Sequence, residues 1–213
     1  KRYLLINDSL SSPNSSLKSL CEVSFEFLNT PGLFIGSSPF YALHATGRES
    51  GVIIDIGEYQ TRCACLYDRM KLPETVIETP VGGGSVTNFF KSTLRDQNFY
   101  FAGPDGTTLA RTCKETGGYV AMNYENEKPE KFKVKINDND EFVELQQERC
   151  LCTEILFNPE IGGINAQGIG KIVAESIARC DEALIPEITQ NVVIVGGTSL
   201  LHGQQQRLES ELG

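Results

Sequence analysis

The chain lacks the features that mark nucleic-acid-binding and membrane-embedded proteins. Its formal net charge is −9 and its pI is about 4.8, and Lys and Arg form no run. These absences exclude the positive footprint that binds DNA, RNA or an anionic membrane surface. No apolar run approaches the ~18 residues that a membrane-spanning helix needs. We therefore expect no direct nucleic-acid partner and no membrane insertion.

The cysteines have neither the number nor the spacing of a disulfide framework. There are seven, an odd count, and the simplest interpretation is a reducing compartment, either cytosol or nucleus. Two C-x-C pairs, Cys63/Cys65 and Cys150/Cys152, could together form a four-thiolate zinc site, although structural zinc sites usually have wider spacing within each pair. The favoured alternative places Cys63 and Cys65 on one face of a strand, as small core residues.

Strand and helix patterns mix along the chain, which predicts an α/β fold. Apolar and β-branched runs predict strands at 3–6, 33–35, 51–57, 61–67, 71–78, 132–136, 142–145 and 191–195. Helical spacing and capping residues predict helices at 17–28, 40–46, 85–94, 107–116, 169–177, 182–188 and 204–212. The segments 51–57, 61–67 and 71–78 are expected to form an antiparallel meander, and 137–140 a hairpin turn.

Two bends in this pattern suggest phosphate or nucleoside binding. The first is the hairpin Asp55-Ile56-Gly57-Glu58, where a strand carries a carboxylate to its end and a glycine permits a tight turn whose N–H groups can face an anion. Asp55 could hold a hydrated Mg²⁺; the alternative is a simple turn. The second is the glycine pair Gly196-Gly197 after a buried strand. It would let a flat ligand lie on bare backbone, or it would serve close helix–strand packing.

Four further stretches of the sequence follow the order of one known family. They are Asn29-Thr30-Pro31, Ala45-Thr46-Gly47-Arg48, the stretch from Glu148 to Pro159, which is similar to E-R-F-x-x-x-E-x-L-F-x-P, and the continuous segment from Ile164 to Leu212. Through these stretches the chain resembles actin and the actin-related proteins over nearly its whole length. This resemblance implies an actin-like ATPase fold with an RNase H-like core, a mixed sheet flanked by helices, and mainly the large nucleotide-facing lobe.

The resemblance also implies a division of the chain. Residues 1–80 would contribute part of the lower lobe and the core with the second phosphate hairpin. Residues 81–165 would form an inserted upper subdomain, and 166–213 would return to the core with the adenosine-facing glycines. We expect the chain to be a piece that lacks the family's N-terminal phosphate hairpin and its C-terminal tail.

The same resemblance assigns a nucleotide site. The implied ligand-binding residues are Asp55, Gly57, Gly83, Arg111, Lys114, Glu115, Gly196 and Gly197, with Asp55 holding the metal through water. The implied cofactor is ATP or ADP with Mg²⁺ or Ca²⁺ in the full-length protein. This piece alone is expected to bind it with reduced affinity or not at all.

The chain departs from the family at positions that carry the chemistry. Ser38 stands where the family has the glutamine that positions the attacking water, and Ser38 is too short to hold water at the same place. Glu58 and Tyr59 replace an aspartate and a glycine of the second hairpin. Arg62 replaces a histidine, and its charge could instead serve phosphate. Pro80 replaces an acid near the ribose.

These departures favour a nucleotide-binding scaffold subunit of a cytoskeletal or other multiprotein assembly, with weak or no ATP hydrolysis. Its partners would be other protein subunits, in an actin-like filament or complex, in the cytoplasmic cytoskeleton or alternatively in the nucleus. The first alternative is a polymerising ATPase, in which hydrolysis is coupled to assembly. The others are a chromatin-remodelling subunit and a sugar-kinase-like phosphotransferase, for which no residue stands out as the base that a substrate hydroxyl requires.

Overall fold

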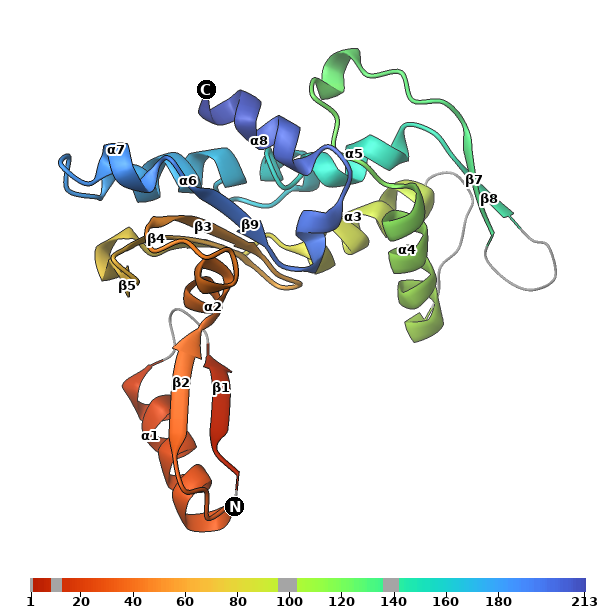
Figure 1. Cartoon of the computed structure of the whole chain (residues 1–213). Helices are drawn as coiled ribbons and strands as arrows, with labels where there is room; N and C mark the ends of the chain where they lie inside the picture. Colours follow the sequence, from red (N-terminus) through yellow and green to blue (C-terminus); the bar gives the residue numbers. More distant parts are fainter. Residues whose placement is uncertain (1, 9–12, 96–102, 136–141) are drawn as a thin grey trace. The chain divides into compact units, whose positions relative to one another are not determined.

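The computed structural model describes all residues except 1, 9–12, 96–102 and 136–141 (Figure 1). Contacts divide the chain into two compact units. The first unit comprises Lys1–Asp55, Cys63–Val76 and Ser176–Val193, and the second comprises Ile56–Arg62, Ile77–Glu175 and Ile194–Gly213. Both units draw on separated stretches of sequence, so the predicted division at residues 80 and 165 stays a prediction.

One sheet has the strand order β5-β4-β3-β9, and β6 also pairs with β4. Its strands are β3 (Gly51–Ile56), β4 (Thr61–Tyr67), β5 (Met70–Lys71), β6 (Ile77–Thr79) and β9 (Val192–Val195). In β3 the apolar residues Val52, Ile53 and Ile54 are fully buried, as the unbroken apolar run predicted. In this order β3 lies between β4 and β9, and β9 is the last strand, so the bends that follow β3 and β9 leave neighbouring strands of one sheet.

In the first unit, β1 (Leu4–Asp8) pairs in parallel with β2 (Leu33–Ser37), with Leu4 opposite Leu33. The predicted helix over 17–28 is α1 (Asn14–Glu22) followed by a π-helical turn, η1 (Val23–Phe27). Helix α2 (Ser38–Ala45) follows β2, and α7 (Ile185–Ile188) precedes β9.

The predicted extended segment 71–78 is wrong in its middle. After β5, Pro73–Thr75 forms a 3-10 turn, η2, before β6 begins at Ile77. Proline cannot donate to a strand ladder, which favours the break. The hydroxyl of Thr75 stabilises the turn by two hydrogen bonds: it accepts from the amide of Cys65 at 2.9 Å and donates to the carbonyl of Leu72 at 2.7 Å.

In the second unit, α3 (Gly83–Arg95) packs against both α4 (Gly103–Gly117) and α5 (Glu148–Glu154) (Figure 1). Strands β7 (Phe132–Lys135) and β8 (Phe142–Leu145) pair antiparallel as predicted, and the predicted turn at 137–140 lies outside the described residues. Helices α6 (Ile169–Ala178) and α8 (Gln204–Leu212) agree with the sequence pattern. Short 3-10 turns occur at Tyr124–Asn126 (η3), Pro159–Gly162 (η4) and Gly197–Leu200 (η5).

All seven cysteines lie in the described part of the chain and are free thiols. Cys63 and Cys65 are both buried in β4, as expected of core residues. Within the described ranges, no cluster of three or more His, Cys, Asp or Glu side chains could hold a metal ion, which leaves the zinc alternative without support. No helix in the same ranges is both long enough and apolar enough to cross a bilayer.

Candidate functional site

The hairpin after β3 packs against the start of α3. The amide of Gly57 donates to the carbonyl of Gln60 at 3.0 Å and closes the turn. The amides of Gly83 and Gly84 donate to the carbonyls of Gly57 and Glu58 at 2.8 and 2.7 Å. A helix leaves its first amides without internal partners, so here the hairpin satisfies two of the groups that could otherwise bind an anion.

Helix α4 supplies a buried cation beside this hairpin. Lys114 is 4% exposed, and its Nζ donates to the carbonyl of Gly83 at 3.2 Å and to the hydroxyl of Thr87 at 3.0 Å. Burial lowers the pKa of Lys114, and the negative charges of Glu115 and Glu58 oppose that shift. Lys114 therefore joins α4 to the first turn of α3 by two hydrogen bonds, and it also lines a pocket.

A second cation of α4 pairs with the hairpin directly. Arg111 lies three residues before Lys114 in the same helix, and its Nη2 lies 2.5 Å from Oε1 of Glu58. The two side chains are 47% and 38% exposed, respectively. Because both charges remain in contact with water, this pair is of the weakly stabilising kind.

The glycine pair completes the arrangement from the other end of the chain. Strand β9 runs into Gly196, whose φ of 95° lies in the left-handed region that favours glycine, and then into η5. A Cβ added to Gly197 would meet no atom within 4 Å, so its backbone faces open space. The hydroxyl of Thr198 donates to the carbonyl of Gly57 at 3.4 Å, which joins the glycine bend to the hairpin.

These parts enclose a pocket of about 460 Å³ within the second unit. Its lining residues are Glu58, Arg111, Lys114, Glu115, Gly197, Thr198, Leu200 and Leu201. Leu200 is 86% exposed, an uncovered apolar surface at the edge of the pocket. The pocket thus combines glycine backbone and leucine side chains with two cations (Arg111 and Lys114) and two carboxylates (Glu58 and Glu115). Its volume is that of a site for a small organic ligand.

Six of the predicted site residues occur together in this region. Arg111, Lys114, Glu115 and Gly197 line the pocket. Gly57 and Gly83 lie just behind it, because Gly57 accepts from Thr198 and a Cβ on Gly83 would collide with the Thr198 hydroxyl.

The other three predicted residues are not among the lining residues. Gly196 directly precedes the pocket backbone. Asp55, half-buried in β3, and Ser38, at the start of α2, belong to the first unit. The side-chain amide of Asn7 donates to Ser38 Oγ at 3.1 Å, and Ser38 Oγ lies 3.2 Å from Asn7 Oδ1. The metal-binding role of Asp55 and the water-positioning role of Ser38 stay predictions.

The structure shows the surroundings of Tyr59 and Arg62, two residues that depart from the family pattern. The side chain of Tyr59 is 85% exposed and is not among the residues that line the 460 Å³ pocket. Arg62 donates through Nε to Glu78 at 2.9 Å, so its charge is balanced by a neighbouring carboxylate.

Sequence reasoning did not assign Thr198, Leu200 and Leu201 to the site. The available signal was their place directly after the glycine pair, where a turn brings successive residues to one ligand surface.

This geometry defines an α/β protein in which a hairpin at a strand end and a glycine-pair bend meet at one polar pocket. The chain belongs to the actin family, which it matches over residues 1–128 and 100–213. The predicted membership and the predicted actin-like fold, with a mixed sheet flanked by helices, are thereby confirmed. The chain is also similar to a Dictyostelium discoideum protein named "Putative actin-29", with 23% identity over 220 residues. That alignment covers 98% of this chain but only 56% of the relative, so the chain spans little more than half of that protein's length.

Proposed function

We propose that this chain forms the nucleotide-facing part of an actin-related scaffold subunit that binds ATP or ADP with a divalent cation and hydrolyses little or none of it. The observation that carries the proposal is the 460 Å³ pocket, because three predicted residues of α4 (Arg111, Lys114 and Glu115) line it together with Gly197, which is far from them in the sequence. Its partners are other protein subunits of an actin-like filament or complex, in the cytoplasmic cytoskeleton or in the nucleus.

The chemistry of the pocket suits a nucleoside. The bare backbone of Gly197, with the side chains of Leu200 and Leu201, offers an apolar surface for a flat base. Glu115 and Lys114 offer an acceptor and donors for ribose hydroxyls, and Arg111 is a fork of donors that suits phosphate oxygens. Asp55 is a carboxylate at a strand end, the kind of ligand that a hydrated Mg²⁺ takes.

Two residues, Ser38 and Arg62, argue against efficient hydrolysis. The Ser38 hydroxyl is hydrogen-bonded to Asn7 and is shorter than the glutamine that the family pattern leads us to expect. The charge of Arg62 is balanced by Glu78. A rival function, a polymerising ATPase, would need an attacking water held within a fraction of an ångström, and these side chains do not favour it.

Calorimetric titration of the full-length protein with ATP tests the binding proposal. Gly197→Trp fills the pocket without a backbone clash, since a Cβ at Gly197 meets open space. We expect ATP affinity to fall by at least about tenfold, the equivalent of one lost favourable contact of ~1.4 kcal/mol. Gln206→Trp, at an exposed position of α8, adds the same side chain elsewhere and should leave affinity unchanged. Equal heats for all three proteins would remove the pocket assignment.

Phosphate release, measured over a range of protein concentrations, separates the scaffold from the polymerising ATPase. A scaffold subunit gives a flat and very slow release of phosphate at every concentration. Release that rises steeply with assembly would favour the ATPase instead.

A further inference from the structure

The carboxylate of Glu58 lies over the first turn of α3. A Cβ built on Gly83 would come within 3.2 Å of Glu58 Oε2, and one built on Gly84 within 3.3 Å of Oε1. The two glycines therefore allow the carboxylate to approach the start of a 13-residue helix. Negative groups are favoured at such a helix start, where the macrodipole is positive.

Glu58 also accepts a hydrogen bond from the guanidinium of Arg111. Nη2 of Arg111 lies 2.5 Å from Glu58 Oε1, so the one carboxylate faces both the helix start and the guanidinium. The guanidinium is the group that a phosphate chain in this pocket would bind, and the helix start adds a positive field although the amides of Gly83 and Gly84 already donate to the hairpin. The pair is partly exposed, and such pairs exchange partners at little cost.

Glu58 lines two cavities of the second unit. It borders the 460 Å³ pocket and also a pocket of about 290 Å³, which is lined by Glu58, Tyr59, Gly84, Ser85, Thr87, Asn88 and Thr107. Of the lining residues, Glu58 is shared by both. A ligand that filled both pockets would therefore lie beside its carboxylate.

We infer that Glu58 acts as an internal anion that competes with the phosphate chain of a bound nucleotide. It is a specificity-determining residue: it leaves the base and ribose region open but opposes added phosphate charge, so the site discriminates against the triphosphate. This inference rests on the proposed nucleotide site and deepens it. Loss of the negative charge should free Arg111 for phosphate and remove a repelling charge from the start of α3, although the amides of Gly83 and Gly84 stay bonded to the hairpin.

The test compares adenosine, ADP and ATP by calorimetry, without divalent cation, on the full-length protein and on Glu58→Gln. Glutamine keeps the length of the side chain and removes its charge. We expect ATP affinity to rise on the order of tenfold, because the variant removes the repulsion between one carboxylate and a nearby phosphate in a solvent-exposed site. Adenosine has no phosphate, so its affinity should change less than twofold. The gain should shrink between 50 and 300 mM salt, because exposed charges are screened. Glu160→Gln, an exposed charge-matched control, should change neither affinity.

A double variant tests whether Arg111 is the group that Glu58 withholds from phosphate. Arg111→Gln combined with Glu58→Gln should abolish most of the gain in ATP affinity, because the released guanidinium is then missing. If Glu58→Gln binds adenosine normally but its ATP affinity is unchanged or falls, the competition is refuted while the nucleotide site stands. If neither ligand binds wild type or variant, the proposed function fails and the inference fails with it.

Discussion

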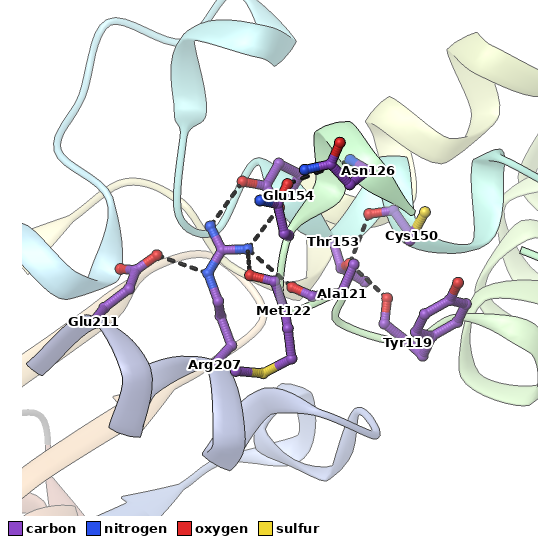
Figure 2. A network of polar contacts seen from close by, with 10 residues as sticks. Tyr119, Ala121, Met122, Asn126, Cys150, Thr153, Glu154, Arg207 and Glu211 are labelled. Atoms are coloured by element: carbon purple, nitrogen blue, oxygen red, sulfur yellow. Dashed lines mark hydrogen bonds and ion pairs between the residues drawn. The ribbon is translucent and has the colours of Figure 1, made fainter. Parts of the chain in front are cut away.

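Arg207 of α8 offers a sharp test of what holds the second unit together (Figure 2). Its guanidinium donates to the carbonyls of Ala121 and Met122 at 2.8 and 3.1 Å. It pairs with Glu154 of α5 at 3.1 Å and with Glu211 at 2.8 Å. The Arg207 and Glu154 side chains are only 13% and 8% exposed. One arginine therefore joins the C-terminal helix to two other segments of the same unit.

Arg207→Met should lower the free energy of unfolding by about 3 kcal/mol. Removal of one partner from a buried ion pair costs about 3–5 kcal/mol, because the other charge stays buried without compensation. The slight exposure of both side chains places Arg207→Met at the lower end. Methionine keeps an apolar stem near Phe157, whose ring centroid lies 4.8 Å from the guanidinium carbon. Glu211→Gln, which removes only the more exposed pair within α8, should cost about 0.5 kcal/mol.

The loss should depend on pH in a definite direction. Burial raises the pKa of Glu154 above its ordinary 4.5, and Arg207 opposes the rise. Without Arg207 the pKa of Glu154 rises further, so the folded state binds a proton more readily than the unfolded chain. The added cost is then absent below about pH 4.5 and complete above the raised pKa. Urea unfolding at pH 7 and pH 5 measures this; a loss under 1 kcal/mol, or an equal loss at both pH values, would refute the reasoning.

Two further predictions concern thiols and a close backbone contact. Burial raises the pKa of the Cys152 thiol to about 12, so mass spectrometry after brief iodoacetamide treatment of the native protein should find the half-buried Cys21 alkylated well before Cys152. Equal labelling would contradict the packing of α5. Gly168→Ala should destabilise by at least about 2 kcal/mol in urea unfolding, since its new Cβ would collide with the carbonyl of Phe157. A neutral result would mean that this approach is not as close as described.

Local sequence signals were sufficient for several elements. The bounds of β4 (Thr61–Tyr67) and α8 (Gln204–Leu212) agree with the predicted 61–67 and 204–212. In β4 a mainly apolar run that begins at Thr61 follows a tight turn, and in α8 helical spacing follows a glycine whose φ is 86°. These signals act between near neighbours, so a sequence shows them directly.

Helix α5 shows where such signals fail. It was not predicted, because Glu148, Thr153 and Glu154 are buried although they are polar, and no apolar stripe marks its buried face. Distant partners satisfy two of these groups: the hydroxyl of Thr153 donates to the carbonyl of Tyr119 at 2.8 Å, and Glu154 pairs with Arg207.

The sequence by itself determined the family, the order of most elements and the two bends that could approach a nucleotide. Only the tertiary structure decided that Glu58 meets Arg111 and that Thr198 meets Gly57. Those partners lie 53 and 141 residues apart. Contacts at such separation follow from packing of whole strands and helices, and no local periodicity encodes them.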